Sequence, residues 1–563
     1  MQRYVLTLLF ITHVVSAQSP FPKDTFIPPL DIPLLLSGTF GELRSDHFHS
    51  GIDLKTQQRE GLPIYAIGSG YVSRIKISRW GFGKAIYIQH PDGNYTSVYA
   101  HLQQFSPEIQ SFVKKLQYQK QSYEVEVYPD PEQIPVKKGE VIAYSGNTGS
   151  SAGPHLHFEI RDANQRPLNP LQLGWKVEDN VLPTIKGVFA YTLDAQSQVN
   201  QYNTKVPLKI HQQSPGTFIA SKIYAHGAIG FGIEAFDRQN HTYNKNGVYK
   251  VELKLNGTPY FSYDFESFTF KETLYINAFI DFSHYKKFKK RIQKGFIEPQ
   301  NPLSIYTNHI NNGILKIEDQ LSYTVEIKVS DFAGNESTVI IPIEGKKQEI
   351  LHKNDILITE RFLRAGIDNL YELENVSVYF PEGTFYENFY LDLAKEDSLF
   401  KIHHENIPLH KSYTITFDAS QYSGDERKQM FIAYMNREGS LEYQNTRKEG
   451  DQLSARTRKL GRFKLARDTV PPTVTPLNFK QGQWLTNFRY LRLQIKDDLT
   501  GIKSYNATLN GRWILMEYDP KTQTISYDFK DLDLEDAKHI LELNVVDNVG
   551  NNTTFTSTFF KKN

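Results

Sequence analysis

The sequence predicts a mainly β protein in which an antiparallel sheet unit with a helical insertion is followed by about three β-sandwich domains. Three observations predict this fold class. Aromatic residues make up 13% of the 563 residues, with 33 Tyr and 36 Phe, which suits β-structure better than disorder or helical bundles. Short alternating segments separated by glycine turns fill the first part of the chain, and similar segments recur in the rest. A chain of this length is too long for one compact core.

The first residues, MQRYVLTLLFITHVVSAQSP, have the pattern of a secretory signal peptide. Arg3 provides a positive start, Tyr4 to Val15 form an apolar run, and Val15-Ser16-Ala17 is a small-residue cleavage site. We therefore expect residues 1–17 to be removed and the protein to be exported to the periplasm, the cell envelope or the extracellular space. An N-terminal membrane anchor is the alternative, but this run is too short to span comfortably, and no other segment reaches membrane length.

Residues 18–175 are predicted to form the first folded domain. Its segment AIYIQH alternates between apolar and polar residues, and the turn PDGN at 91–94 joins it to YTSVYAHL. Alternation on both sides of such a turn is typical of a hairpin, so we expect an antiparallel sheet built from hairpins.

A helix is expected to interrupt this sheet. The segment SPEIQSFVKKLQYQKQ, residues 106–121, places Ile109, Phe112, Val113 and Leu116 at helical spacing. Ser106 can cap this helix, and Pro107 suits its first turn. With the strand that follows, the helix forms a predicted insertion at about 103–135.

Two resembling segments organise the rest of the chain. IKVSDFAGNESTVIIPI at 327–343 and LNVVDNVGNNTTFTSTFF at 543–560 each place Asp-x-x-Gly-Asn between two strands, which predicts a hairpin. The repetition predicts β-sandwich domains of immunoglobulin-like type at 176–345 and 471–563. The segments between them indicate a third such domain at 346–470, which a proline-rich joint, DTVPPTVTP, connects to the last one.

Charge and cysteine content exclude several classes of protein. Lys+Arg total 64 and Asp+Glu total 63, so the balance does not favour nucleic acid or an anionic membrane as a partner. The basic run KKFKKRIQKGF at 286–296 is interpreted as a solvated helix or loop face rather than a polyanion site. Because the chain has no cysteine, it has no disulfides, and any zinc site must use His, Asp or Glu.

The chain contains two His-x-His pairs, in HFHSGID at 47–53 and in PHLHFEI at 154–160. Residues two apart on a strand share a face, so His155, His157 and Glu159 lie together, opposite a face of apolar residues. His49 and Asp53 are four apart, and the glycine between them allows the chain to bend. Two imidazoles and one carboxylate are a standard zinc set that leaves a fourth position for water. A single His-x-His more often satisfies a core, but two in one unit favour a metal.

These segments resemble the lysostaphin/LytM-type zinc endopeptidases, family twenty-three of the metallopeptidases, which cut peptide bridges in bacterial peptidoglycan. HSGIDLKT resembles the family's His-x-Gly-x-Asp, and GLPIYAIGSGYV resembles its Gly-x-Pro-Val-x-Ala strand pair. GKAIYIQHPDGNYTSVYAHL resembles its central hairpin, which ends in Tyr-Ala-His-Leu. VKKGEVIAYSGNTGSSAGPHLHFEIR resembles its final block. The resemblance covers Phe40 to Pro170 and implies an antiparallel-sheet metallopeptidase core.

The resemblance implies one zinc ion per chain, with His49, Asp53 and His157 as its ligands. It also implies a catalytic pair, His101 and His155. We expect His155 to act as the general base and His101 to stabilise the oxyanion or share the proton work. Glu159 either orients a histidine or is solvated at the strand end.

Two further histidines, His90 and His47, lie in the same region of the sequence. His90 precedes a hairpin turn and is expected at the surface. His47 has the strand parity of His49, and as a fourth protein ligand it would close the site and make the zinc structural.

The implied function is that of an exported zinc metalloendopeptidase that hydrolyses peptide cross-links of bacterial peptidoglycan, with its peptide stems or cross-bridges as the partner. One alternative is a catalytically silent member of the fold that regulates another cell-wall hydrolase, although all five expected residues are present. The other is a surface binding protein with structural zinc. The insertion departs from the family pattern, and we expect it to flank the groove and limit access. The bond cleaved and the oligomeric state stay open.

Overall fold

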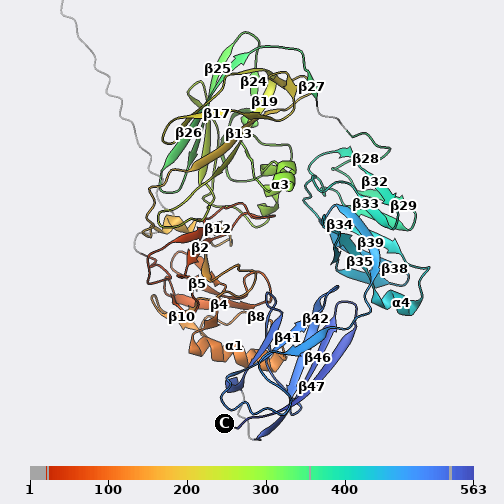
Figure 1. The fold of residues 1–563 in the computed structure, drawn as a ribbon. Helices are drawn as coiled ribbons and strands as arrows, with labels where there is room; N and C mark the ends of the chain where they lie inside the picture. Colours follow the sequence, from red (N-terminus) through yellow and green to blue (C-terminus); the bar gives the residue numbers. More distant parts are fainter. Residues whose placement is uncertain (1–20, 22–24, 354–356, 532–535, 563) are drawn as a thin grey trace, which may run out of the picture.

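The computed structural model of the chain describes residue 21 and residues 25–353, 357–531 and 536–562. It is mainly β, as predicted (Figure 1). The predicted signal peptide lies outside the described residues. We use the predicted limits as labels: the first domain ends at 175, the second covers 176–345, the third 346–470 and the fourth 471–563. These limits stay predictions. Among the helices of the described residues, none combines the length and apolar character that a membrane span needs.

The first domain is built on one large antiparallel sheet with the order β1-β2-β11-β6-β5-β4-β8, in which β12 pairs with β11 and β9 with β4. A small sheet, β3-β10-β7, lies beside it. The strands are β1 (Leu36–Gly38), β2 (Ile52–Lys55), β3 (Pro63–Tyr65), β4 (Gly70–Ile77), β5 (Lys84–His90), β6 (Tyr95–Ala100), β7 (Gln104–Phe105), β8 (Val125–Val127), β9 (Pro135–Val136), β10 (Val141–Tyr144), β11 (His155–Arg161) and β12 (Pro167–Leu168).

The central strand β11 has two different faces. Leu156, Phe158 and Ile160 are fully buried in the apolar core, and the intervening histidines and Glu159 project from the other face. In the register of the sheet, His157 lies opposite Asp53 of β2 and opposite Ala100 of β6. Directly paired residues project to the same face, so the register alone brings Asp53 beside His157.

The insertion contains the predicted helix, α1 (Pro107–Lys120), followed by the edge strand β8, which pairs with β4. Ile109 and Val113 are buried on the inner face of this helix, as the apolar spacing of its residues predicts. Ser106 occupies the N-cap position, but its side chain makes no capping hydrogen bond, and Pro107 occupies the first turn. The prediction of the helix is therefore confirmed. Ser106 stands at the predicted cap position, but the predicted capping hydrogen bond is absent.

The strands of the second domain form one network of fifteen, in which the long strand β19 pairs with β13, β22 and β24 as well as with β14 and β26. The strands are β13 (Thr184–Thr192), β14 (Gln198–Val199), β15 (Tyr202–Asn203), β16 (Val206–Leu208), β17 (Ile210–Ser214), β18 (Thr217–Ala220), β19 (Ile223–Phe236), β20 (Lys250–Leu255), β21 (Thr258–Asp264), β22 (Gln293–Lys294), β23 (Tyr306–His309), β24 (Leu315–Ile317), β25 (Ser322–Ser330), β26 (Glu336–Gly345) and β27 (His352–Lys353). Two short helices are α2 (Ile276–Phe279) and α3 (Phe282–Phe288).

The first and second domains share one hydrophobic core. Phe40 of the first domain stacks on Phe268 of the second, with ring centroids 4.9 Å apart, and Phe48 lies 5.5 Å from Phe265. Because Phe48 immediately precedes His49, this aromatic interface also fixes the segment that carries the first predicted metal ligand.

The third and fourth domains each have a separate core. The third has two five-stranded sheets, β29-β30-β34-β38-β37 and β32-β33-β39-β35-β36, a two-stranded sheet and the helix α4 (Gly424–Gln429). Its strands are β28 (Phe362–Leu363), β29 (Asn369–Leu373), β30 (Val376–Phe380), β31 (Phe389–Tyr390), β32 (Leu393–Glu396), β33 (Leu399–Ile402), β34 (Tyr413–Asp418), β35 (Met430–Met435), β36 (Leu441–Tyr443), β37 (Thr446–Glu449), β38 (Gln452–Thr457) and β39 (Gly461–Arg467).

The fourth domain has two four-stranded sheets, β40-β41-β45-β44 and β43-β42-β46-β47. Its strands are β40 (Thr473–Pro476), β41 (Tyr490–Lys496), β42 (Ile502–Leu509), β43 (Arg512–Trp513), β44 (Glu517–Asp519), β45 (Thr524–Asp528), β46 (Lys538–Asp547) and β47 (Asn552–Phe560). The strands flanking each Asp-x-x-Gly-Asn turn, β25 with β26 and β46 with β47, pair as the predicted hairpins.

The four domains follow one another around a closed circuit, so that the fourth returns to the first (Figure 1). The insertion helix makes part of this contact. Lys114 of α1 forms an ion pair with Asp531, and the ring of Tyr118 lies 5.2 Å from that of Trp513. Leu515 of the fourth domain is 1% exposed and belongs to the core shared by the first two domains.

Candidate metal centre

Three side chains of the first domain bring one donor atom each to a common point. Nε2 of His49 lies 3.0 Å from Nδ1 of His157, and Oδ1 of Asp53 lies 3.1 Å from the first nitrogen and 3.0 Å from the second. All three residues are at most 7% exposed. Asp53 and His157 come from the paired strands β2 and β11, and His49 comes from the bend before β2.

The second nitrogen of each imidazole is held by an oxygen. Nδ1 of His49 donates to the backbone carbonyl of Thr39 at 2.8 Å, and Nε2 of His157 lies 3.1 Å from Oε1 of Glu159. Glu159 is fully buried and also contacts Arg161 and the hydroxyl of Ser50. Of the two alternatives left open for Glu159, solvation at the strand end is wrong, and its contact with Nε2 of His157 favours the role of orienting that ring.

The carboxylates of Asp53 and of the neighbouring Glu159 are held in their charged form. Burial acts to raise the pKa of Asp53, but attraction to His49 and hydrogen bonds from His155 and His157 hold it well below its usual value. Burial likewise opposes ionisation of Glu159, but Arg161 and His157 lower its pKa to about 2. Arg44 adds a hydrogen bond to Oδ2 of Asp53 at 2.8 Å. The sequence did not point to Arg44.

The donor set fits a zinc ion. It offers two imidazole nitrogens and one carboxylate oxygen, whose separations of 3.0–3.1 Å are close to those between ligands bonded at about 2.0–2.1 Å. Partner oxygens on the far nitrogens of both imidazoles are the usual support of metal-binding histidines. The cluster of donor atoms within 4.8 Å of one another contains His49, Asp53 and His157. His47 is outside it, and its Nδ1 contacts Asp46 instead, 2.8 Å away.

His101 and His155 lie next to this cluster, with their ring centroids 4.8 Å apart. Nδ1 of His101 donates to the carbonyl of Thr148 at 2.8 Å, and Nδ1 of His155 donates to that of Gly153 at 2.9 Å. A carbonyl oxygen can only accept, so each of the two rings carries a proton on Nδ1. Burial lowers the pKa of His101 to about 3, which keeps this imidazole neutral.

His101 is held in a strained backbone conformation. It follows β6 with a φ of +60°, in the left-handed region that residues other than glycine rarely adopt. Its backbone N–H donates to the carbonyl of Phe82, whose ring also lies 4.8 Å from that of His157. Strain of this kind is concentrated at functional sites, where the surrounding structure holds a side chain in place.

The histidines line a groove of about 1270 Å³. Ser150 to Pro154, in the loop before β11, form one wall. His241 to Asn244 of the second domain form another. None of the insertion residues 103–135 lines it, so the expectation that the insertion flanks the groove is wrong. That helix instead packs against the fourth domain, which no local pattern in the sequence encodes.

The expectation for His90 is also wrong. The residue is 1% exposed, and its ring contacts the carbonyl of Ser69 and the hydroxyl of Ser97 at 2.9 and 2.7 Å. It is a satisfied core histidine, because its strand is covered on the side to which it points.

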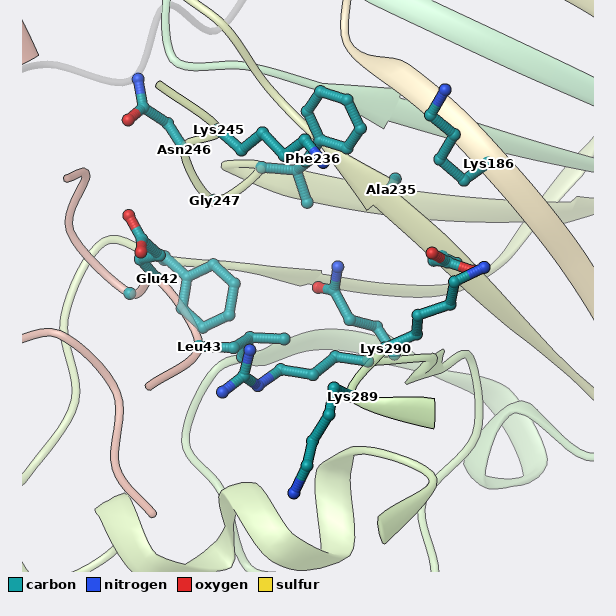
Figure 2. Close-up of a pocket in the computed structure, with 16 residues that line it drawn as sticks. Glu42, Leu43, Lys186, Ala235, Phe236, Lys245, Asn246, Gly247, Lys289 and Lys290 are labelled. Atoms are coloured by element: carbon teal, nitrogen blue, oxygen red, sulfur yellow. The ribbon is translucent and has the colours of Figure 1, made fainter. Parts of the chain in front are cut away.

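A second cavity, of about 550 Å³, lies between the first two domains (Figure 2). Gly247 of the second domain packs closely against Glu42 here, since a Cβ at this glycine would lie 3.0 Å from the Cα of Glu42. The cavity is lined by basic side chains, namely Lys186, Lys245, Lys289, Lys290 and Arg291. Lys289 and Lys290 of the basic run are exposed, but Ile292 to Phe296 of the same run are buried, so the interpretation as a solvated face holds only for the first part of the run.

The fourth domain supports the wall of the groove. The ammonium of Lys521 donates to the carbonyl of Ser151 at 3.0 Å and to that of Asn147. We expect Lys521→Ala to raise KM about fivefold without loss of metal, since a hydrogen bond contributes about 1 kcal/mol and the metal ligands are untouched. Steady-state kinetics with a soluble peptide of the class that the sequence resemblance implies measure this. Lys530→Ala, an exposed lysine of the same domain, is the matched control, and an equal change in both variants would contradict the expectation.

Glu159→Gln tests the support of His157. We expect zinc affinity to fall about 10- to 100-fold, because the amide orients the imidazole less well than the carboxylate does. Competition with a chromophoric chelator measures the affinity. Glu108→Gln, at an exposed position of α1, is the control, and unchanged affinity in Glu159→Gln would rule out this role.

Comparison with known proteins assigns two parts of the chain. Residues 47–118 and 122–170 match the model of peptidase family M23, and residues 360–468 match that of the Zu5-like domain. The chain is 34% identical over 131 residues to the DD-carboxypeptidase/endopeptidase Mpg of Neisseria meningitidis, which is 23% of this chain and 24% of that protein. It is 37% identical over 123 residues to an uncharacterized metalloprotease of Haemophilus influenzae, which is 22% of this chain and 20% of that protein.

A solved structure is also among the proteins to which this chain is similar. The catalytic domain of the antimicrobial peptidase lysostaphin from Staphylococcus simulans is 25% identical, with a TM-score of 0.19, over 24% of this chain and 90% of that one. The match to the curated relatives spans about a quarter of their length or less. The family resemblance read from the sequence is confirmed for the first domain.

Proposed function

We propose that this chain, which carries a peptidase domain of family M23, is an exported zinc metalloendopeptidase that hydrolyses peptide cross-links of bacterial peptidoglycan. The convergence of His49, Asp53 and His157 at 3.0–3.1 Å, beside two histidines in one groove, is the observation that carries the proposal. An open fourth position is what distinguishes a catalytic zinc site from a structural one, and the place of His47 outside the cluster supports the catalytic form.

The proposed ligands are His49, Asp53 and His157. A zinc ion held by these three residues would lower the pKa of a bound water to near 7 and would polarise the scissile carbonyl. Nε2 of His155 lies 3.5 Å from Oδ1 of Asp53, next to the ligand atoms. From there His155 accepts the proton of the attacking water as general base and delivers it to the leaving amine as general acid.

His101 is proposed to share the proton work rather than to donate to an oxyanion. Its proton is committed to Thr148, so Nε2 is an acceptor, and its lowered pKa keeps it in this form. In that form the imidazole can accept a hydrogen bond from the attacking water and hold it in line. This favours one of the two roles that the sequence left open.

The test is to incubate the purified protein with intact peptidoglycan, with and without a chelator, and to identify the released fragments by mass spectrometry. We expect chelator-sensitive fragments whose ends define the cleaved bond. Absence of fragments from protein that is shown to hold zinc would instead support the catalytically silent regulator. The proposed export is tested separately, by sequencing the N-terminus of the mature protein, which we expect at Gln18.

A further inference from the structure

Three carboxylates gather in the second domain, away from the histidine cluster. Asp179 lies on the linker before β13, Asp237 directly follows β19, and Asp331 directly follows β25. Each offers an oxygen within 4.8 Å of the other two. Asp237 and Asp331 are each only 4% exposed. Ionised carboxylates this close repel one another, and burial leaves little water to screen them.

The hydrogen bonds of this cluster are incomplete at one point. Both oxygens of Asp331 accept from Asn335, at 2.8 and 2.7 Å, and Oδ1 of Asp179 accepts from the backbone of Val181. Oδ1 of Asp237, in contrast, is buried and has no hydrogen-bond partner. A buried oxygen without a partner is uncommon in folded proteins and points to a missing ligand.

Asn246 presents a second unpaired group beside it. Asp237 and Asn246 form an antiparallel bridge with two backbone hydrogen bonds of 2.9 Å, so their side chains project to the same side. Asn246 is 3% exposed, and neither its Oδ1 nor its Nδ2 has a partner. An unpaired carboxylate oxygen and an unpaired amide oxygen are therefore offered together at one place.

The basic side chains adjacent in sequence to Asp237 and Asn246 are directed at an aromatic ring and not at the carboxylates. Arg238 and Lys245 both lie over the ring of Phe236, 5.3 and 5.0 Å from its centroid, and Figure 2 shows Lys245 beside that ring. Burial together with repulsion from Asp331 and Asp179 raises the pKa of Asp237 to about 8. The negative charge of the cluster is thus not balanced by these side chains.

A matching cluster at the junction of the third and fourth domains provides a contrast. Asp468, Asp497 and Asp547 lie as close together as the first three, and Asn551 holds both oxygens of Asp547 as Asn335 holds those of Asp331. There, however, Oδ1 of Asp497 accepts from the backbone of Gly501 at 2.6 Å and of Thr500 at 2.8 Å. The residue in the place of Asp237 is thus satisfied by the chain itself.

We propose that Asp179, Asp237 and Asp331, with the amide oxygen of Asn246, bind one calcium ion in the second domain. The donors are all oxygens and three are carboxylates, a set that selects hard divalent cations. A cavity of about 250 Å³, lined by Asp179, Asp237 and Asn246, adjoins the cluster and provides room for the water ligands that calcium takes in addition.

The site lies at the base of a wall of the peptidase groove. Asp237 and Asn246 are the two ends of the loop whose tip, His241 to Asn244, lines that groove. Within the loop, Gln239 hydrogen-bonds Leu34 and Leu36 of the first domain. Calcium at the two ends of the loop therefore sets the position of this wall against the first domain. The binding itself does not depend on the proposed hydrolysis.

The test is a calorimetric titration of Ca²⁺ into the full chain, loaded with zinc, in buffer freed of other divalent cations. We expect one saturable site per chain and a rise in melting temperature on binding. Asp237→Asn should bind at least tenfold more weakly, Asn246→Ala should also bind more weakly, and Asp497→Asn, the matched control, should bind as the parent does. Equal binding by the parent and Asp237→Asn, or no binding by the parent, would overturn the proposal.

Two measurements exclude trivial explanations. In cation-free buffer we expect Asp237→Asn to melt at or above the temperature of the parent, because it replaces a buried carboxyl whose ionisation its neighbours oppose with an amide of the same shape, so weaker binding would not reflect unfolding. Mg²⁺ is titrated in parallel, and equal affinity for Mg²⁺ would overturn the assignment to calcium.

Discussion

His157→Ala is expected to abolish both zinc binding and peptide hydrolysis. The change removes one of three donor atoms and leaves the carboxylates of Asp53 and Glu159 buried beside a cavity, without the imidazole that lies between them. Loss of a residue that only orients a ligand costs about 10- to 100-fold in affinity, and loss of the ligand itself should cost more. Zinc content after dialysis and fragment release from peptidoglycan measure the two effects.

The control is chosen to separate chemistry from folding. His241→Ala removes an exposed histidine that lines the same groove outside the ligand cluster, and it should keep zinc and hydrolysis close to those of the parent. Because His157→Ala can also destabilise the sheet, His49→Ala is examined beside it, and melting curves are recorded for all three. Full zinc content in both ligand variants would show that the ion is held elsewhere.

His155→Ala is expected to lose hydrolysis while it keeps zinc. A positioned general base contributes typically 10²- to 10⁴-fold to a rate, and we expect kcat to fall within that range. The ring of His155 lies beside Asp53 but outside the group of three donor atoms, so zinc content should stay near one per chain. Rapid kinetics with a soluble peptide at saturating zinc measure kcat.

The two variants together distinguish the roles of the two histidines of β11. If zinc disappears from His155→Ala as it does from His157→Ala, the assignment of ligand and base is wrong. His47→Ala is the control for the loss of a groove histidine, because its ring bonds Asp46 and should matter little for either readout.

The central part of the site could be predicted because it obeys a local rule. Alternation along β11 places His155, His157 and Glu159 on one face, and the apolar residues between them fix that face by burial. The register of β2 against β11 then brings Asp53 beside His157, and the bend before β2 brings His49 to the same place. The alternation could not tell which histidine of the pair faces the metal, because both point the same way.

Other features depend on contacts between distant segments, which no local pattern reports. His90 is buried, although it precedes a turn, because other parts of the chain cover its side of the sheet. The spacing of α1 predicted a helix with one apolar face, but the same spacing suits a helix beside a groove or under another domain. Arg44 and Lys521 contact the site from outside the motifs, and only the folded structure brings them there.

The support of the groove by the fourth domain has a consequence for the order of folding. Lys521 reaches Ser151 across 370 residues of sequence, and Leu515 enters the core of the first two domains. Domains fold as units during synthesis, the N-terminal ones first, and contacts of such large sequence separation form late. The first domain can therefore assemble its histidine cluster early, but its groove reaches final form only when nearly the whole chain has emerged. In a nascent or C-terminally truncated chain, the zinc ligands should therefore be in place, while the groove wall that Lys521 contacts should lack its support.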